Sequence, residues 1–461
     1  MTEFRQDPGS FRDPGGHVFW LNGLPYRSVT AVGRDDMELL RQSGLADELS
    51  AGGQLVPFST DGAMPDGAMP DGAMRLKLSP LPWISYPYEW CFEQLQDAAT
   101  LTIDVMLAAL AKGMMLKDAS AFNVAWRGGR PIFLDHGSFT RYIAGRPWPA
   151  YRQFCEHFLA PLAVISRNDA LLGMISRCFL DGLPLDLASQ LLPWSSRLRP
   201  SLLIHIHLHA KVQRRFADST RKSGGKSATM SINSLRAMLA NLRAGVSAMR
   251  SPLPQSAWHD YYHDTNYNDQ AFADKHRLVA KACGELAATA RVIDLGANNG
   301  EFSRVAAEHA ALVVAADMDH GAVAGLYRSI RGQADSRIYP LVQNLDNPTP
   351  GLGLFNTERQ PFLKRCRGDL AMGLALIHHL RIGSNWSLAH IVRLFAQCAD
   401  SAIVEFVPKD DGQVQRLLRS RPDICPDWTL EQVCQAFAQS FSQCHVENIV
   451  ESKRSIIFLK K

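Results

Sequence analysis

The segment that most constrains the fold is residues 291–309, RVIDLGANNGEFSRVAAEH, in which an apolar run ends at a glycine turn and continues as a helix. Gly296 and Gly300 occupy the turn, where a sharp change of direction or a close approach to a ligand favours residues without a Cβ. From about Trp258 onward, short apolar runs of this kind alternate with helical segments. This alternation predicts an α/β fold with a parallel sheet and helices on both of its faces.

The next two predicted strands end in polar residues that suit a nucleoside. The run ALVVAAD ends at Asp317, and an acid at that position can accept hydrogen bonds from both ribose hydroxyls. The run IYPLVQNLD ends in Asn344, Leu345 and Asp346, where a polar side chain would reach an adenine edge. The three strand ends together predict a nucleoside site.

The glycine spacing argues against a dinucleotide at this site. The nicotinamide fingerprint is G-x-G-x-x-G, and its second glycine lets the backbone approach a pyrophosphate. In this chain Asn298 stands at that second position, and the spacing is Gly296-x-x-x-Gly300. Because S-adenosylmethionine carries no phosphate, the pattern favours it as the cofactor.

Residues 257–461 resemble the class I S-adenosylmethionine-dependent methyltransferases motif by motif. VIDLGANNG resembles their first motif, GDLAMGLALIHHL the fourth strand and its turn, SAIVEFVPKDD the fifth strand, and CHVENIVESKRSIIFLK the antiparallel terminal hairpin. The resemblance implies a Rossmann-like fold with a seven-stranded sheet. It also implies that Asp294 holds the methionine amino group of S-adenosyl-L-methionine. The residues implied as cofactor-binding are Asp294, Gly296, Asn298, Gly300, Asp317, Met318, Asn344, Leu345 and Leu376.

The same resemblance indicates residues for the chemistry and for the acceptor. Methyl transfer mainly needs orientation and a dry site, but an oxygen or nitrogen acceptor also needs a base. His378 and His379 are the candidate catalytic residues, although each is also explained as a structural histidine. Candidate substrate residues are Trp258, Tyr262, Tyr267 and Glu405. Packing on a neighbouring domain explains the aromatic residues equally well.

At 461 residues the chain is too long for a single core, so we expect separate domains. We predict a kinase-like α+β domain over residues 1–210, a basic helical linker over 211–256 and the methyltransferase domain over 257–461. In the first domain, Asn22-Gly23 predicts a hairpin. Other predicted features are a surface loop at the repeat DGAMPDGAMPDGAM (61–74), helices over 35–49, 91–112 and 231–249, and a mostly helical stretch over 150–217 with breaks near Pro161 and Pro184.

The kinase-like assignment comes from LKDASAFNVAWRGGRPIFLDHGSF. In kinase-fold phosphotransferases an Asp orients the attacking hydroxyl, an Asn five residues later binds magnesium, and the Asp of a D-x-G motif binds the metal at the phosphates. Asp118, Asn123 and Asp135 match this spacing. We find no glycine-rich phosphate loop and no V-A-I-K lysine, and Lys77 lies in the wrong context. We therefore expect a degenerate domain, and turn capping also explains the two aspartates.

Composition narrows the function class. No apolar run approaches the ~18 residues that span a bilayer, and the polar N-terminus does not resemble a signal peptide. The nine cysteines form no CxxC pair, which is typical of reduced thiols, so we expect a cytoplasmic protein without a membrane segment. His205, His207 and His209 have no acidic residue near them, so no metal site is expected.

Charge gives little support for a nucleic-acid partner. Residues 211–250 hold nine Lys or Arg and one Asp, a net charge of +8, whereas the whole chain carries +4. No aromatic platform is interleaved with these charges, as binding of single strands would favour. A solvated linker face is the simpler interpretation.

The function predicted from the sequence is S-adenosylmethionine-dependent methyl transfer, with the N-terminal domain recognising or presenting the substrate. Two alternatives stay open: a bifunctional kinase–methyltransferase, and a scaffold or regulatory protein that binds the cofactor without catalysis. The acceptor and the oligomeric state stay undefined. The whole chain, including YPYEW, LKDAS and WPAYRQFCEHFLAPL, is similar to a group of large bacterial methyltransferase-like proteins.

Overall fold

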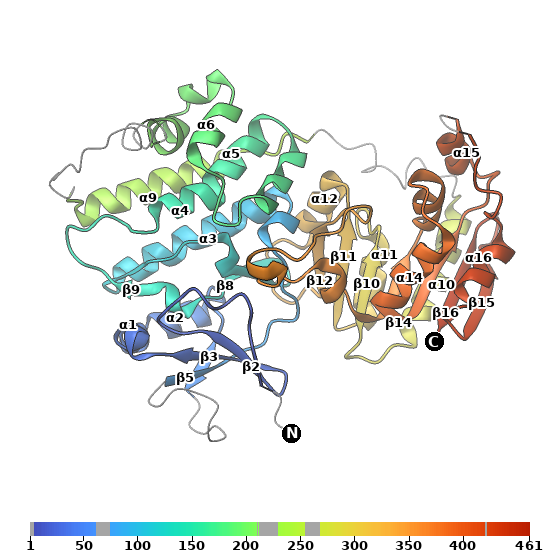
Figure 1. The fold of residues 1–461 in the computed structure, drawn as a ribbon, viewed down its shortest axis with the longest axis horizontal. Coiled ribbons are helices and arrows are strands. Elements are labelled where there is room, and N and C mark those ends of the chain that lie inside the picture. Colours follow the sequence, from blue (N-terminus) through green and yellow to red (C-terminus); the bar gives the residue numbers. More distant parts are fainter. Residues whose placement is uncertain (1–3, 61–73, 210, 212–228, 254–267, 420–421) are drawn as a thin grey trace. The chain divides into compact units, whose positions relative to one another are not determined.

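The structure is a computed structural model that describes residues 4–60, 74–209, 211, 229–253, 268–419 and 422–461 (Figure 1). The chain forms two compact units. Unit 1 comprises Met1–Pro252 and Leu352–Arg359, and unit 2 comprises Leu253–Gly351 and Gln360–Lys461. The predicted functional division at residues 210 and 256 stays a prediction.

Unit 2 is built on a seven-stranded sheet with the order β12-β11-β10-β13-β14-β16-β15. The five strands from β10 to β14 are parallel, whereas β16 is antiparallel to β14 and to β15. This order, with its antiparallel terminal hairpin, is the class I methyltransferase fold, so the predicted fold class is confirmed. The strands are β10 (Arg291–Leu295), β11 (Leu312–Asp317), β12 (Ile338–Val342), β13 (Gly368–Gly373), β14 (Ala399–Phe406), β15 (Gln443–Asn448) and β16 (Ser455–Lys460).

The central strands of this sheet are almost continuously apolar because helices cover both faces of a parallel sheet. Every residue of β12 is buried, as are the last four residues of β10. Helix α10 packs on α11, and α14 packs on α16. The helices of unit 2 are α10 (Asp269–Gly284), α11 (Glu301–His309), α12 (His320–Ile330), α13 (Phe362–Arg365), α14 (Leu388–Cys398), α15 (Gly412–Leu418) and α16 (Leu430–Phe437).

Unit 1 is an α+β structure, as predicted. A five-stranded antiparallel sheet has the order β1-β2-β3-β5-β4, and two small sheets pair β6 with β9 and β7 with β8. The predicted hairpin is confirmed, because β2 and β3 flank Asn22 and Gly23, both of which have positive φ. The strands are β1 (Phe4–Gln6), β2 (Val18–Leu21), β3 (Leu24–Val29), β4 (Phe58–Thr60), β5 (Met74–Leu78), β6 (Met114–Leu116), β7 (Val124–Arg127), β8 (Arg130–Phe133) and β9 (Phe139–Arg141).

The helices of unit 1 correct two details of the sequence prediction. The helix expected over 35–49 is two helices, because the chain turns at Gly44 with φ 74°. The break expected near Pro161 is absent, since α4, the π-helical turn Cys155–Leu159 and α5 follow one another without interruption, and the π-helical turn lies just before the proline. The helices are α1 (Ala31–Gln42), α2 (Leu45–Ala51), α3 (Phe92–Ala111), α4 (Tyr151–Phe154), α5 (Ala160–Arg167), α6 (Leu185–Leu191), α7 (Pro200–Leu202) and α9 (Ile232–Ser247).

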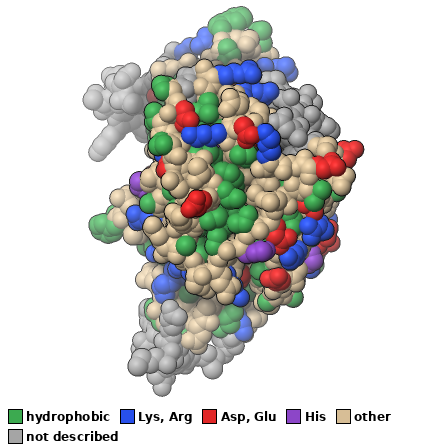
Figure 2. All heavy atoms as spheres, turned by 90° about the vertical axis from the view of Figure 1, so that its right-hand side faces the viewer, with side chains coloured by type: hydrophobic (Ala, Val, Ile, Leu, Met, Phe, Trp, Pro, Cys, Tyr) green, Lys and Arg blue, Asp and Glu red, His purple; other side chains and the backbone are tan. Residues whose placement is uncertain are grey.

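Two surface features bear on possible partners. In the described part of the chain, no helix has both the length and the apolar character needed to cross a membrane. Figure 2 shows one face of the molecule, on which acidic and basic side chains occur in small intermixed groups around a central band of hydrophobic side chains. Intermixed charges of this kind are typical of a solvated surface. The DGAMP repeat, apart from Met74, and residues 212–228 of the basic segment lie outside the described residues.

Candidate cofactor site

A cavity of about 360 Å³ lies at the carboxyl ends of β10, β11, β12 and β13. Open α/β sheets bind their ligands at this edge. Seven of the nine predicted cofactor residues line the cavity: Gly296, Asn298, Asp317, Met318, Asn344, Leu345 and Leu376. The other two, Asp294 and Gly300, are not among the lining residues.

The glycine turn after β10 is left-handed at three positions, Gly296, Asn298 and Gly300, with φ values of 72°, 51° and 79°. Asn tolerates this conformation better than most residues with a Cβ, which explains Asn298 in the place of a glycine. A Cβ on Gly300 would stand 2.4 Å from Leu326 Cδ1 on α12. Gly300 is therefore required for packing of the turn against α12.

Asp317 ends β11 and is held by the backbone on both sides. Its Oδ2 accepts a hydrogen bond from the Asn298 N–H at 2.8 Å, and its Oδ1 accepts one from the Asp319 N–H at 2.8 Å. Each carboxylate oxygen keeps a further lone pair for a ligand hydroxyl. Burial raises the pKa of Asp317 to about 6, so the carboxylate is mostly ionised at neutral pH.

Gln343 is a lining residue that the sequence prediction missed. Its side chain is buried, and its Oε1 accepts a hydrogen bond from Thr349 Oγ1 at 2.9 Å. Its Nε2 has no hydrogen-bond partner among the described residues. Since buried polar groups are almost always paired, this amide offers a hydrogen bond to a ligand in the cavity. Gln343 directly precedes Asn344 in the sequence. The sequence gives no sign of which of the two amides faces the cavity from a buried position, and the structure shows that Gln343 is the buried one.

Asp294 lies beneath the turn. It is buried and accepts a hydrogen bond from Ser303 Oγ at 2.5 Å. Burial raises the pKa of Asp294 to about 7. Its implied contact with the methionine amino group therefore rests on the family resemblance, because its side chain does not line the cavity.

The two candidate catalytic histidines occupy different environments. His379 lines the cavity, whereas His378 is fully buried and does not. Their rings lie 4.2 Å apart, and neither ring nitrogen of His378 has a hydrogen-bond partner among the described residues. Burial, with a smaller effect of the Arg454 charge, lowers the pKa of His379 to about 4. His379 is thus a neutral imidazole at physiological pH.

The candidate substrate residues do not gather at the cavity. Glu405 is fully buried, and its carboxylate pairs with Lys275 Nζ at 2.7 Å and Arg454 Nη1 at 3.2 Å. It is not among the lining residues, because these two buried cations hold it inside the fold. The other three, Trp258, Tyr262 and Tyr267, lie outside the described residues.

In unit 1, the structure brings the kinase-like residues Asn123 and Asp135 together at Ser138, and Asp118 is hydrogen-bonded to Asn123. The Ser138 hydroxyl donates to Asp135 Oδ2 at 2.5 Å and accepts from Asn123 Nδ2 at 3.1 Å. Burial, with the nearby charge of Asp135, raises the pKa of Asp118. Both aspartates also cap turns, Asp118 by accepting from the Ser120 N–H at 2.9 Å and Asp135 from the Gly137 N–H at 3.1 Å. The two explanations offered by the sequence are therefore compatible.

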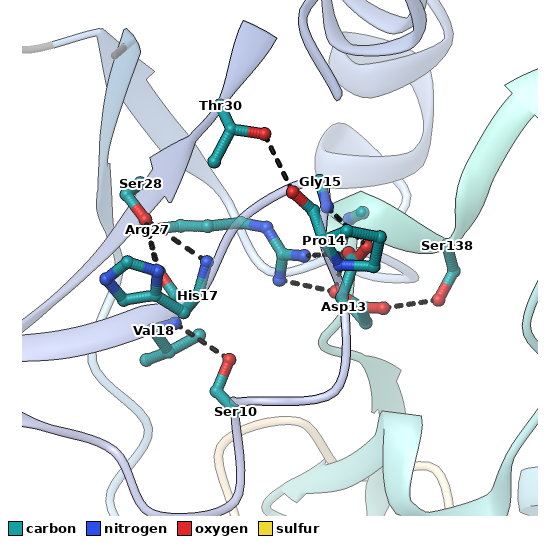
Figure 3. Close-up of polar contacts among 12 residues, drawn as sticks. Ser10, Asp13, Pro14, Gly15, His17, Val18, Arg27, Ser28, Thr30 and Ser138 are labelled. Atoms are coloured by element: carbon teal, nitrogen blue, oxygen red, sulfur yellow. Dashed lines mark hydrogen bonds and ion pairs between the residues drawn. The ribbon is translucent and has the colours of Figure 1, made fainter. Parts of the chain in front are cut away.

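Sequence reasoning missed the cation that joins this cluster, Arg27 on β3. Its guanidinium pairs with Asp135 and, at 3.0 Å, with Asp13 from the loop between β1 and β2 (Figure 3). Burial opposes ionisation of Asp135, yet Arg27 and the Ser138 hydroxyl leave the pKa of that carboxyl below its ordinary value. The cavity beside Arg27 measures only about 10 Å³, which is room for about one water molecule.

The three histidines of the HIHLHA segment have hydrogen-bond and aromatic partners. His205 lies between the Tyr151 hydroxyl at 2.7 Å and Asn241 Oδ1 at 3.0 Å. The ring nitrogens of His207 contact the hydroxyls of two serines at 2.8 and 2.7 Å, and the His209 ring packs edge-on against Tyr151. Within the ranges that the structure describes, no group of three or more His, Cys, Asp or Glu is arranged to hold a metal ion.

Comparisons with solved structures return methyltransferases at low similarity. N-methyltransferase NodS from Bradyrhizobium japonicum WM9 aligns with 42% of this chain and 98% of its own, at 8% identity and a TM-score of 0.32. Magnesium protoporphyrin IX methyltransferase ChlM from Synechocystis PCC 6803 aligns with 44% and 89%, at 16% identity and a TM-score of 0.29. The bifunctional kinase-methyltransferase WbdD aligns with 41% and only 38%, at 17% identity and a TM-score of 0.28. The fold assignment therefore rests on the strand order.

A curated relative covers nearly the whole chain. No protein-family model matches the sequence. Nodulation protein NoeA from Rhizobium meliloti (strain 1021) is 34% identical over 454 residues, which span 97% of this chain and 94% of NoeA. The predicted similarity of the whole chain to one group of bacterial proteins is confirmed. The chain belongs to the family of nodulation protein NoeA.

Proposed function

We propose that unit 2 binds S-adenosyl-L-methionine and transfers its methyl group to an acceptor. The observation that carries this proposal is the placement of Asp317. Its carboxylate lines the cavity at the end of β11, directly beside the left-handed turn at Asn298. An acid beside such a turn suits the two hydroxyls of a ribose.

The lining residues fit the rest of the cofactor. Gln343 Nε2, which has no partner among the described residues, would hold the adenine together with Asn344 and Leu345. Gly296, Asn298 and Leu376 would border the methionine part. When bound, S-adenosyl-L-methionine supplies an electrophilic methyl group on a sulfonium ion.

On the acceptor side, Leu374 and Leu380 provide apolar walls that exclude water. His379 lines the cavity as a neutral imidazole that can orient the acceptor by a hydrogen bond and can take its proton only as a weak base, because burial lowers its pKa to about 4. His378 would act only through its contact with the His379 ring.

Membership of the NoeA family supports a role in nodulation for this chain. We propose that unit 1 recognises or presents the acceptor. The absence of a membrane-spanning helix among the described residues is compatible with a cytoplasmic location.

Calorimetric titration of S-adenosylmethionine into the full chain tests the proposal. We expect binding that Asp317→Ala abolishes and that Asp335→Ala preserves, since Asp335 is exposed and is not a lining residue. Absence of binding to the folded protein would overturn the proposed function. Binding without methyl transfer to any host or bacterial extract would favour the scaffold alternative.

Phosphoryl transfer by unit 1 is a second candidate, favoured by the hydrogen bonds that link Asp118 to Asn123 and Asn123, through Ser138, to Asp135. We propose that it does not occur, because the Arg27 guanidinium pairs with the Asp135 carboxylate that would have to hold the metal, and with Asp13 beside it. Titration of Mg-ATP tests this directly. Binding of Mg-ATP that Asp135→Ala removes would establish the bifunctional alternative.

A further inference from the structure

Asp346 makes a polar bridge across the cavity of unit 2. Its Oδ2 accepts a hydrogen bond from Ser384 Oγ at 2.8 Å, and its Oδ1 accepts one from Trp386 Nε1 at 2.7 Å. Asp346 follows β12, whereas Ser384 and Trp386 follow β13. Asp346 and Ser384 both line the cavity, so the bridge joins one wall to the other.

The strand order shows that this bridge spans two intervening strands of the sheet. In the sheet, β12 and β13 are separated by β11 and β10. Neighbouring strands lie roughly 4.8 Å apart, so the two strands are about 14 Å apart within the sheet. The segments after β12 and β13 therefore meet above the ends of β10 and β11, which carry Asn298 and Asp317.

The donors to Asp346 are tied to the catalytic side of the cavity. The Ser384 N–H donates to the His379 carbonyl, and the Trp386 N–H donates to the Leu380 carbonyl, both at 2.9 Å. These bonds extend the π-helical turn His379–Gly383. Asn385 adopts a left-handed φ of 58° between the two donors, and this turn lets both side chains reach one carboxylate.

We propose that Asp346 is a positioning residue that clasps the His379-bearing turn to the end of β12 and thereby closes the cofactor cavity. This inference rests on the proposed function. The competing role for an acid at this strand end is direct contact with the cofactor. Both oxygens of Asp346 accept hydrogen bonds from the opposite wall, so the carboxylate has a structural role without a ligand. Each oxygen keeps a further lone pair, and the experiment therefore separates the clasp from direct contact with the cofactor.

The test compares variants on the two sides of the clasp in the full chain. Asp346→Ala and the double variant Ser384→Ala/Trp386→Phe are each expected to raise the dissociation rate of S-adenosylmethionine about tenfold, as expected for loss of hydrogen bonds to a charged acceptor. Hydrogen exchange of the amides of residues 379–386 should also speed up in both. The exposed Asp335→Ala change is the matched control and should alter neither measurement.

Asp346→Asn separates positioning from charge. An amide oxygen still accepts from the Trp386 indole, and its NH₂ can donate to the Ser384 hydroxyl. We therefore expect near wild-type dissociation and exchange in this variant, which also guards against a general folding defect.

Two results would overturn the clasp. Faster dissociation in Asp346→Ala with an unchanged rate in Ser384→Ala/Trp386→Phe would make Asp346 a direct cofactor contact. Unchanged exchange of residues 379–386 in Asp346→Ala would show that the bridge does not hold the turn. The exchange measurement needs no cofactor. It therefore tests whether Asp346 holds the turn even if S-adenosylmethionine does not bind and the proposed function is wrong.

Discussion

Asp317 is the residue on which the proposed site most depends, and its ionisation sets a pH dependence. Burial raises the pKa of its carboxyl to about 6, from an ordinary value of 3.8. A ribose hydroxyl donates to the ionised carboxylate, so cofactor binding favours the charged form. By linkage, binding then releases a proton at pH values near and below 6.

Affinity for S-adenosylmethionine should therefore weaken as the pH falls through 6. One pH unit below that pKa, only about one carboxylate in ten is ionised, and the affinity should be up to roughly tenfold lower at pH 5 than at pH 7.5. Calorimetry at several pH values measures this. Asp317→Asn should bind weakly and lose the change centred near pH 6, although Asp294, with a pKa of about 7, still titrates in this variant. A flat profile in the unchanged protein would contradict the assignment.

The sequence predicted the role of some acidic residues in the site and not of others. Asp317 stands at the end of an apolar run and could be identified from its position alone. Glu405 stands at a comparable position on β14, yet Lys275 and Arg454 hold it inside the fold. Local sequence does not distinguish these two acids, because their partners come from distant segments.

The elements of unit 2 are joined by a buried ion network, and its contribution to stability can be measured. Glu405 on β14 pairs with Lys275 on α10 and with Arg454, which also pairs with Asp411 at 2.8 Å. Glu405→Gln removes the carboxylate shared by buried Lys275 and Arg454, of which Arg454 keeps Asp411, and should lower the free energy of unfolding by about 3–5 kcal/mol.

Glu447→Gln is the matched control for that change. Glu447 on β15 pairs at 2.6 Å with the half-exposed Lys281, and loss of such a pair should cost about 1 kcal/mol or less. Urea unfolding of both variants makes the comparison. Equal losses of unfolding free energy in the two variants would show that burial does not increase the contribution of the Glu405 ion pairs to stability.

The turn between β10 and α11 gives a second comparison at this scale. Gly300 and Gly332 both have positive φ, but a Cβ on Gly332 meets no atom within 4 Å, whereas one on Gly300 meets Leu326. Gly332→Ala should cost about 1–2 kcal/mol of stability, from backbone strain alone.

Gly300→Ala should cost a further 1–3 kcal/mol or so from overpacking, and it should also weaken cofactor binding because the turn carries Asn298. Urea unfolding and calorimetry measure the two effects. Equal stability of the two variants would mean that Leu326 gives way without cost.

The whole molecule contains two compact units, each with its own buried core. We expect two calorimetric unfolding transitions, because separate domains rarely unfold in one step. S-adenosylmethionine at a hundred times its Kd adds about 2.7 kcal/mol to the unit that binds it. For a domain of this size the expected rise in melting temperature is roughly 5–10 °C.

One transition alone should shift with the cofactor, and Asp317→Ala should remove the shift. A single transition, or an equal shift of both, would contradict independent units. Mg-ATP should shift neither transition, since the Arg27 guanidinium pairs with the Asp135 carboxylate that would have to hold the metal, and with Asp13 beside it.

The sequence by itself determined the fold of unit 2 and the main residues of its cavity. Apolar periodicity, glycines at a sharp turn and an acid at a strand end are local signals, because each reflects constraints on one strand, turn or helix. These signals predicted the α/β sheet and Asp317, and the resemblance to the class I methyltransferases added the terminal hairpin and lining residues such as Met318 and Leu376.

The tertiary structure decided the pairings. Asp346 meets donors 38 and 40 residues away, and Arg27 meets Asp135 across 108 residues. Which segments meet is set by strand order, since β12 and β13 reach each other only above β11 and β10. Burial likewise explains why Gln343 Nε2 lacks a partner among the described residues, why His379 is neutral and why Glu405 is paired with cations. Burial is a property of the packed molecule that no local pattern encodes.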